Sequence, residues 1–185
     1  MKINEYINIV LDELESSTKQ ISDDEAETFV QMITTSSKVF VAGAGRSGLM
    51  AKSFAMRMMH MGIDSYVVGE TVTPNIGQED LLIISSGSGE TSSLVSMAEK
   101  AKKLEATVAL VSIFPESTIG KKADITIKLP GSQKDKEANH YKTIQPMASL
   151  FEQTLLIFYD AVILRYMEKQ GLDSDSMFGK HANLE

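Results

Sequence analysis

The sequence predicts an α/β fold, a doubly wound parallel sheet of five strands with helices on both faces. Short apolar runs of the kind that form buried parallel strands alternate along the chain with longer amphipathic segments. Two of these runs, 39–42 and 81–85, lead into glycine-rich stretches and then into helices. Alternating strands and helices form parallel sheets with right-handed crossovers, which bind ligands at the carboxyl ends of their strands.

Composition narrows the class of protein. The chain has 185 residues, of which 43% are hydrophobic, so we expect a single domain over residues 1–185. With 18 basic and 25 acidic residues the net charge is −7, and the absence of a basic run argues against nucleic-acid binding. Cysteine is absent, which excludes disulfides and thiolate chemistry. No signal peptide or membrane-spanning run is visible, so a cytoplasmic protein without membrane contact is expected.

Two helices are expected before the first strand. The first carries apolar residues at helical spacing, namely Ile3, Ile7, Val10, Leu11 and Leu14. The second opens at Ser22, which has the spacing of a capping box with Glu25. These N-terminal helices (about 1–36) and the long helix expected over 146–170 supply apolar faces beyond what one sheet needs. We therefore expect an oligomer, with the N-terminal helices and the C-terminal tail (about 171–185) in its contacts.

The first strand, 39–42, leads into the glycine-rich turn 43–48 and then into a helix over 49–61. This helix is rich in methionine, which is typical of a core or a subunit interface. A second strand is expected at 66–68, and the loop 70–78 after it shows no signature that assigns it a role.

The third strand, 81–85, is followed by Ser85-Ser86-Gly87-Ser88-Gly89-Glu90-Thr91 and by a helix from about Ser92 to Leu104. The helix N-terminus offers free backbone N–H groups and the positive end of the dipole. The glycines allow close approach of a ligand, and the hydroxyl groups add uncharged donors. An ordinary helix cap needs one hydroxyl, whereas this loop has several, so the pattern predicts a phosphate-monoester site.

The remaining elements complete the sheet. We expect a fourth strand at 107–111, a short helical turn at Pro115 and Glu116, and a fifth strand at 125–129. A polar connection, 130–142, then leads to a long helix from about residue 146 to 170, which Gly171 ends.

The two glycine-rich stretches carry a resemblance to a known family. Val41-Ala42-Gly43-Ala44-Gly45-Arg46-Ser47-Gly48 together with the Ser85–Thr91 sequence resembles the sugar isomerase (SIS) domain family over roughly residues 30–165. That resemblance implies a doubly wound five-stranded sheet that binds phosphosugars.

Within the family, three features point to a narrower activity. They are the short single domain, the Ser149-Leu150-Phe151-Glu152-Gln153 start of the long helix, and His181-Ala182-Asn183-Leu184 near the C-terminus. The resemblance that these features carry implies isomerisation of D-arabino-hex-3-ulose 6-phosphate to fructose 6-phosphate, in the ribulose monophosphate route of formaldehyde fixation. The same resemblance implies 3-hexulose-6-phosphate synthase as functional partner, a homotetramer, and neither metal nor cofactor.

The implied reaction moves a carbonyl from C3 to C2 through a cis-enediol, so it needs a partly desolvated base. Glu152 fits because it is a carboxylate in an otherwise apolar helix, although the helix dipole alone also favours a glutamate there. In similar isomerases the glutamate at this motif position accepts the proton. The resemblance places His181 across a neighbouring subunit's site, where an imidazole assists ring opening, while a histidine in a free tail is ordinarily solvated.

The resemblance also implies the substrate contacts. Those expected are Ser47, Ser86, Gly87, Ser88, Gly89, Glu90 and Thr91. Arg46 either offsets phosphate or enediolate charge or is a surface arginine at a helix start. His60 is expected to be structural or exposed, and His140, in the polar connection, is not expected to contact the ligand. No histidines and carboxylates are paired at metal-ligand spacing, so no metal is predicted.

Three other functions stay open at this point. One is an aldose–ketose isomerase, such as one acting on arabinose 5-phosphate, since the enediol chemistry is the same. Another is a phosphosugar sensor that keeps the serine loop but needs no base. The third is a dinucleotide-binding protein, because Gly43-x-Gly45-x-x-Gly48 fits that fingerprint, although no acidic residue ends the second strand.

Overall fold

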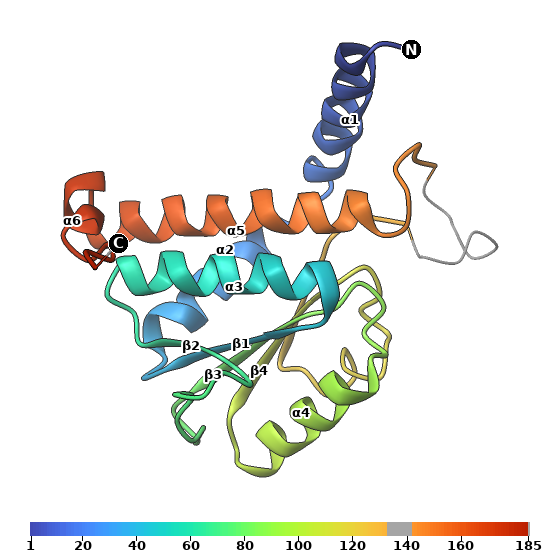
Figure 1. Cartoon of the computed structure of the whole chain (residues 1–185). Coiled ribbons are helices and arrows are strands. Elements are labelled where there is room, and N and C mark those ends of the chain that lie inside the picture. The colour runs from blue at the N-terminus through green and yellow to red at the C-terminus, as the bar shows by residue number, and fades with distance from the viewer. Residues whose placement is uncertain (133–141, 185) are drawn as a thin grey trace.

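A parallel sheet of five strands forms the centre of the molecule (Figure 1). The structure is a computed structural model and describes residues 1–132 and 142–184. The strands are β1 (Val39–Gly43), β2 (Ser65–Val67), β3 (Leu81–Ser85), β4 (Thr107–Ser112) and β5 (Ile125–Lys128). Their order is β2-β1-β3-β4-β5, and every neighbouring pair is parallel. This confirms the predicted doubly wound sheet, with its topological switch point between β1 and β3.

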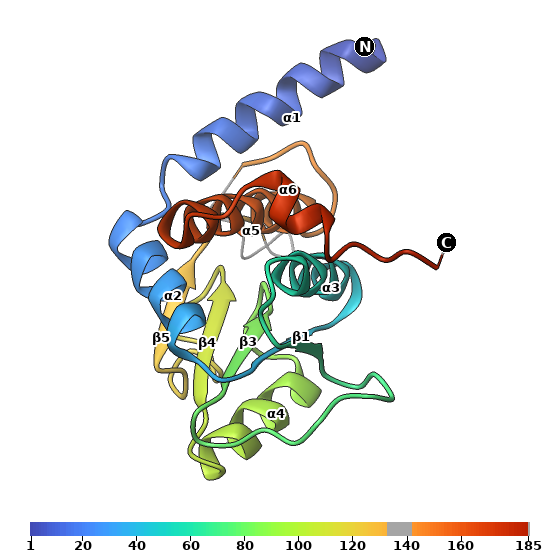
Figure 2. The same cartoon turned by 90° about the vertical axis from the view of Figure 1, so that its left-hand side faces the viewer.

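Helices cover the sheet on both faces, as predicted. They are α1 (Ile3–Thr18), α2 (Asp23–Thr35), α3 (Gly45–His60), α4 (Ser92–Lys103), α5 (Ser149–Gln170) and α6 (Ser174–Phe178). In Figure 1, α4 lies below the sheet, whereas α2, α3 and α5 lie above it. Helix α1 packs against α5 and extends away from the body, as Figure 2 shows. No helix in the described part of the chain is long and apolar enough to cross a membrane.

The strands pack both of their faces into apolar layers. Along β1, Val39 and Val41 face the layer formed with α2, α3 and α5, whereas Phe40 faces the layer formed with α4. Successive strand residues point to opposite faces, so a strand buried on both sides reads as a continuous apolar run. On the upper face the rings of Phe54 and Tyr159 stack 4.1 Å apart and join α3 to α5. This packing fixes where the helices begin relative to the strand ends.

Helix α3 begins at Gly45, four residues before the start at residue 49 that the sequence predicted. The stretch 43–48 had been expected to form a turn. The missing side chain of Gly48 explains the difference, because a Cβ atom there would lie 2.6 Å from the carbonyl oxygen of Gly43. The helix can therefore start directly on the end of β1. Gly45 itself adopts a left-handed φ of 57°, which permits the sharp change of direction.

Other local predictions are confirmed or corrected by the structure. Ser22 caps α2 by accepting a hydrogen bond from the Glu25 N–H at 3.3 Å, but the Glu25 carboxylate accepts from the Lys128 N–H instead of completing a capping box. The segment at Pro115 forms hydrogen-bonded turns and no helix: the Ser117 N–H donates to the Phe114 carbonyl, and the Gly120 N–H donates to Ser117 Oγ. Gly171 ends α5 with φ 63°, as expected. The short helix α6 was not predicted.

Candidate active site

A cavity of about 330 Å³ opens where β1 and β3 end, at the topological switch point. The first turns of α3, α4 and α5 all contribute to its wall. Six of the predicted site residues line it, namely Ser47, Ser86, Gly87, Ser88, Thr91 and Glu152. Three helix N-termini around one cavity present unpaired N–H groups and positive dipole ends, which favours an anionic ligand.

The loop between β3 and α4 is shaped by its own hydroxyl groups. Ser86 Oγ accepts from the Gly89 N–H at 3.1 Å, and Ser88 Oγ accepts from the Glu90 N–H at 3.2 Å. A hydroxyl that accepts a backbone hydrogen bond keeps its own proton for a ligand oxygen. Thr91 is the N-cap of α4, and its hydroxyl forms no capping bond to the described first turn. The loop therefore presents preorganised donors to the cavity.

Two predicted contacts, Gly89 and Glu90, are not among the described residues that line the cavity. Gly89 has φ 64°, and a Cβ atom there would lie 2.0 Å from Ser117 Oγ, so this glycine serves the packing of the loop. Glu90 is exposed, and its carboxylate accepts from the Thr118 N–H at 2.7 Å. Hydrogen bonding to Thr118 holds the pKa of Glu90 below its ordinary value. Both residues therefore hold the loop against the segment that carries Ser117 and Thr118.

Arg46 and Glu152, which both line the cavity, form an ion pair. Arg46 Nη1 donates to Glu152 Oε2 at 3.0 Å and to Ser149 Oγ at 3.0 Å, which links the start of α3 to the start of α5. Only 8% of Glu152 is exposed. The guanidinium and the N-terminal dipole of α5 together offset the burial of this carboxylate. Arg46 therefore belongs to the site and is not a free surface arginine.

The structure adds residues that the sequence analysis missed. Ser132 is buried, lines the cavity and donates to the Met147 carbonyl at 3.2 Å. It lies in the polar connection 130–142, whose sequence carries no signature of a binding site. Ser85 Oγ and Tyr159 Oη lie 2.6 Å apart in the core, and burial raises the pKa of Tyr159. This contact holds the end of β3 against α5.

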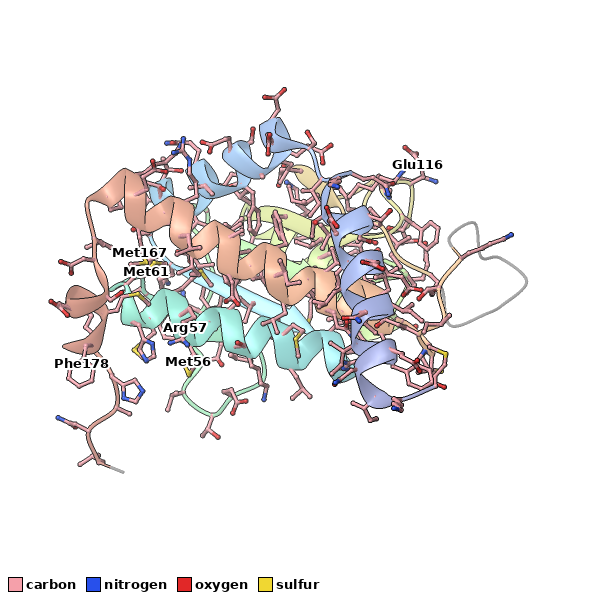
Figure 3. All side chains as sticks on the ribbon, turned by 90° about the horizontal axis from the view of Figure 1, so that it is seen from above. Met56, Arg57, Met61, Glu116, Met167 and Phe178 are labelled. Carbon is pink, nitrogen blue, oxygen red and sulfur yellow. The ribbon has the colours of Figure 1, made fainter. Side chains whose placement is uncertain are left out.

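His181 lies far from the cavity of its own chain. It is exposed, and its ring stacks on His60 with the centroids 5.2 Å apart. His60 ends α3, whereas the cavity is at the start of this helix, about 24 Å away at 1.5 Å per residue. Figure 3 shows Arg57 and Met61 at this far end, beside the segment that carries Phe178.

The other two histidines differ in their surroundings. His60 is buried, as a structural residue would be, and burial, followed by the charges of His181 and Arg57, lowers its pKa. His140 lies outside the described residues. Within residues 1–132 and 142–184, no group of three or more histidine, aspartate or glutamate side chains could hold a metal ion.

The comparisons with known proteins agree with this geometry. A family model described as the SIS domain matches residues 32–157, which include β1 to β5 and the start of α5. The chain belongs to the SIS domain family.

Relatives within this family carry a specific name. This chain is 60% identical to the 3-hexulose-6-phosphate isomerase of Bacillus subtilis over 185 residues, which is 100% of both chains. It is 37% identical to the 3-hexulose-6-phosphate isomerase of Mycobacterium gastri, over 99% of this chain and 92% of the relative. A Methanococcus jannaschii structure, from which that same function was inferred, has TM-score 0.84 and 35% identity, covering 98% of this chain and 99% of the other.

Proposed function

We propose that this protein is a 3-hexulose-6-phosphate isomerase, a single SIS domain that converts D-arabino-hex-3-ulose 6-phosphate into fructose 6-phosphate. The observation that carries the proposal is the position of Glu152, buried in the wall of a cavity that the starts of α3 and α4 and the serine-rich loop also line. A base and an anion site share one small cavity. The 60% identity with the Bacillus subtilis enzyme supports the same reaction.

The phosphate binds where α3 and α4 begin. Backbone N–H groups of both first turns and the hydroxyls of Ser47, Ser88 and Thr91 supply donors around the cavity. Because the loop is already held by its internal hydrogen bonds, binding needs little reorganisation. Anchoring the phosphate fixes the sugar carbons relative to α5, which removes much of the entropic cost of the reaction.

Glu152 then moves one proton between two neighbouring carbons. Its carboxylate removes the proton from C2, and the electron pair of that bond forms the C2–C3 double bond of a cis-enediol as negative charge develops on the C3 oxygen. The hydroxyl proton on the C2 oxygen passes to the C3 oxygen, and Glu152 returns its proton to C3, which leaves the carbonyl at C2 and gives the 2-ketose. Arg46, already 3.0 Å from the base, offsets the enediolate charge.

The wider setting belongs to the same proposal. The substrate forms when 3-hexulose-6-phosphate synthase joins formaldehyde to ribulose 5-phosphate, so the protein acts in formaldehyde fixation or detoxification in the cytoplasm. We propose a homotetramer in which His181 assists ring opening in a neighbour's site. Exposed apolar side chains on α1 and α3 support assembly, namely Ile3, Tyr6, Ile7, Leu11, Leu49, Met56 and Met59.

A coupled assay tests the function. Ribulose 5-phosphate, formaldehyde and the synthase are supplied with this protein and a chelator, and fructose 6-phosphate is measured. Product that depends on this protein and is lost in Glu152→Gln supports the proposal. No product, together with a thermal shift on adding fructose 6-phosphate, would point instead to a phosphosugar sensor or to another substrate, of which arabinose 5-phosphate is the first to try.

A further inference from the structure

A carboxylate on the projecting helix α1 holds the segment that leads into α5. Glu13 Oε2 accepts from Thr143 Oγ1 at 2.6 Å and from Gln145 Nε2 at 2.8 Å, and Glu13 Oε1 accepts from the Ile144 N–H at 2.9 Å. The Gln145 N–H in turn donates to Thr143 Oγ1 at 3.0 Å. Residues 130 positions apart in the sequence are thus joined by a compact set of hydrogen bonds.

The chain just after this contact has a strained backbone. Met147 adopts φ 60°, a left-handed conformation that an ordinary side chain disfavours. Its carbonyl accepts from the cavity residue Ser132, and the next residue, Ala148, lines the cavity and precedes α5. Strain of this kind persists only where neighbouring contacts hold it. Glu13 and Ser132 supply such contacts on either side of Met147.

We propose that Glu13 is a positioning residue for the isomerase, fixing the segment 143–147 so that the first turn of α5 aims Glu152 into the cavity. The inference rests on the proposed function. Among the described residues that line the cavity, none comes from α1, so Glu13 acts on the site through the segment 143–147 that leads into α5. Glu13 holds Thr143, Ile144 and Gln145, which lie outside the proposed phosphate site at the starts of α3 and α4.

The hydrogen-bond set requires an ionised carboxylate. Partial burial raises the pKa of Glu13, but the hydrogen bonds from Thr143, Gln145 and Ile144 outweigh it, so the pKa lies below its ordinary value. All three partners donate, which two carboxylate oxygens can satisfy. A glutamine at this position would keep the shape of the side chain. Its NH₂ group would, however, face one of the three donors, and that hydrogen bond would be lost.

The first test is Glu13→Gln in the coupled assay. We expect kcat to fall by roughly 10- to 100-fold, because a displacement of about 1 Å at the base has that effect, while the Kd of fructose 6-phosphate from calorimetry stays within about threefold. Asp12→Asn is the matched control, since it removes the same charge from the exposed neighbouring position. An unchanged kcat in Glu13→Gln, or an equal loss in Asp12→Asn, would overturn the positioning role.

Thr143 provides a second and independent test. Thr143→Val removes the hydroxyl that Glu13 holds, whereas Thr143→Ser keeps it, so kcat should fall in the first variant and return close to the original value in the second. Glu13→Gln combined with Thr143→Val should be little worse than either alone, because both break one contact. Fully additive losses would contradict the shared contact.

Amide hydrogen exchange separates this inference from the proposed function. In Glu13→Gln the Ile144 amide should lose protection by about tenfold, and in Asp12→Asn it should not. Lost protection with unchanged kcat would overturn the positioning role and leave the isomerase intact. A wild-type protein with normal protection but no isomerase activity would overturn the proposed function, and the inference that rests on it.

Discussion

Glu152 is a single residue whose environment suits a general base. The residue is 8% exposed, its carboxylate pairs with Arg46, and it lies in the first turn of a largely apolar helix. The sequence singled out Glu152 as a carboxylate among apolar neighbours, and the resemblance to the SIS family decided for the role of base. It did not identify the partner, because Arg46 and Glu152 are 106 positions apart and only folding brings them together.

Glu152→Gln should lower turnover by roughly 10²–10⁴, the usual contribution of a general base. The amide keeps the shape of the side chain, so the Kd of fructose 6-phosphate should change little. Asp160→Asn is the matched control, since Asp160 is an exposed acid on the same helix. If kcat were the same in Glu152→Gln and wild type, Glu152 would have no part in the proton transfer.

At the scale of elements, the junction of β1 and α3 depends on two glycines in contact. A Cβ atom on Gly48 would lie 2.6 Å from the Gly43 carbonyl oxygen, and one on Gly43 would lie 2.8 Å from the Gly48 Cα. The sequence placed these glycines in a ligand-binding turn. The structure shows that they let the helix start directly on the strand, and thereby bring its N-terminus to the cavity.

Gly48→Ala should destabilise the protein by about 1–3 kcal/mol, because the new methyl group forces backbone apart at a packed junction. Urea unfolding measures the loss, and phosphosugar binding should weaken as the start of α3 moves. Gly45→Asn is the control for stability, because nothing lies within 4 Å of a Cβ atom there and asparagine tolerates its left-handed φ. An unchanged urea midpoint in Gly48→Ala would contradict this account of the junction.

Helices α2 and α5 are linked by an exposed ion cluster. The Glu27 carboxylate binds Arg165 and lies 2.7 Å from Lys169 Nζ. Hydrogen bonds from Arg165 and then Lys169 lower the pKa of Glu27 to about 2. A group whose pKa is lowered on folding adds stability above its unfolded pKa, and this is lost as pH falls through the folded value.

The melting temperature of Glu27→Gln should therefore lie slightly below that of wild type at pH 7. The gap should close as pH falls from about 4.5 towards about 2. Because the cluster is exposed, the difference is small and should shrink further in high salt. A gap that persists unchanged at pH 2 would show that Glu27 acts through packing and not through charge.

At the scale of the whole molecule, the two ends of the chain lie on the outside of the fold. Helix α1 extends away from the sheet with Ile3, Ile7 and Leu11 exposed, and the tail carries His181 to the end of α3 opposite the cavity (Figures 1 and 2). Apolar side chains at helical spacing predicted the helix correctly. The same pattern could not tell whether α1 packs in the core of its own chain or against another chain, because the apolar spacing of the helix is the same in both cases.

Mixing subunits tests whether the tail completes a neighbour's site. Deleting residues 180–185, or His181→Ala, should lower turnover without unfolding the protein. Coexpressed Glu152→Gln and His181→Ala chains should then exceed the mean activity of the separate variants, because some sites combine an intact Glu152 with an intact His181. Full activity in the deletion would show that the tail is idle, and no gain on mixing would place its effect within one chain.

The sequence by itself determined the sheet, the order of its elements and most of one cavity wall. Apolar runs, glycines and the serine-rich loop are local patterns, and the rule that ligands bind at the carboxyl ends of parallel strands converts them into a site. Ser86, Ser88 and Thr91 were found in this way, whereas the resemblance to the SIS family added Ser47 and decided the role of Glu152. All five line the cavity.

Only the tertiary structure decided which distant residues complete that cavity and what holds them. Ser132 enters the wall, Arg46 meets Glu152, and Glu13 holds the approach to α5, yet none of these contacts has a signature in its own segment. Secondary structure follows from neighbours a few positions apart, whereas these pairs form when packing brings together segments that the chain separates. The fold can therefore be predicted from local sequence patterns, whereas the long-range contacts around Glu152 can be seen only in the folded structure.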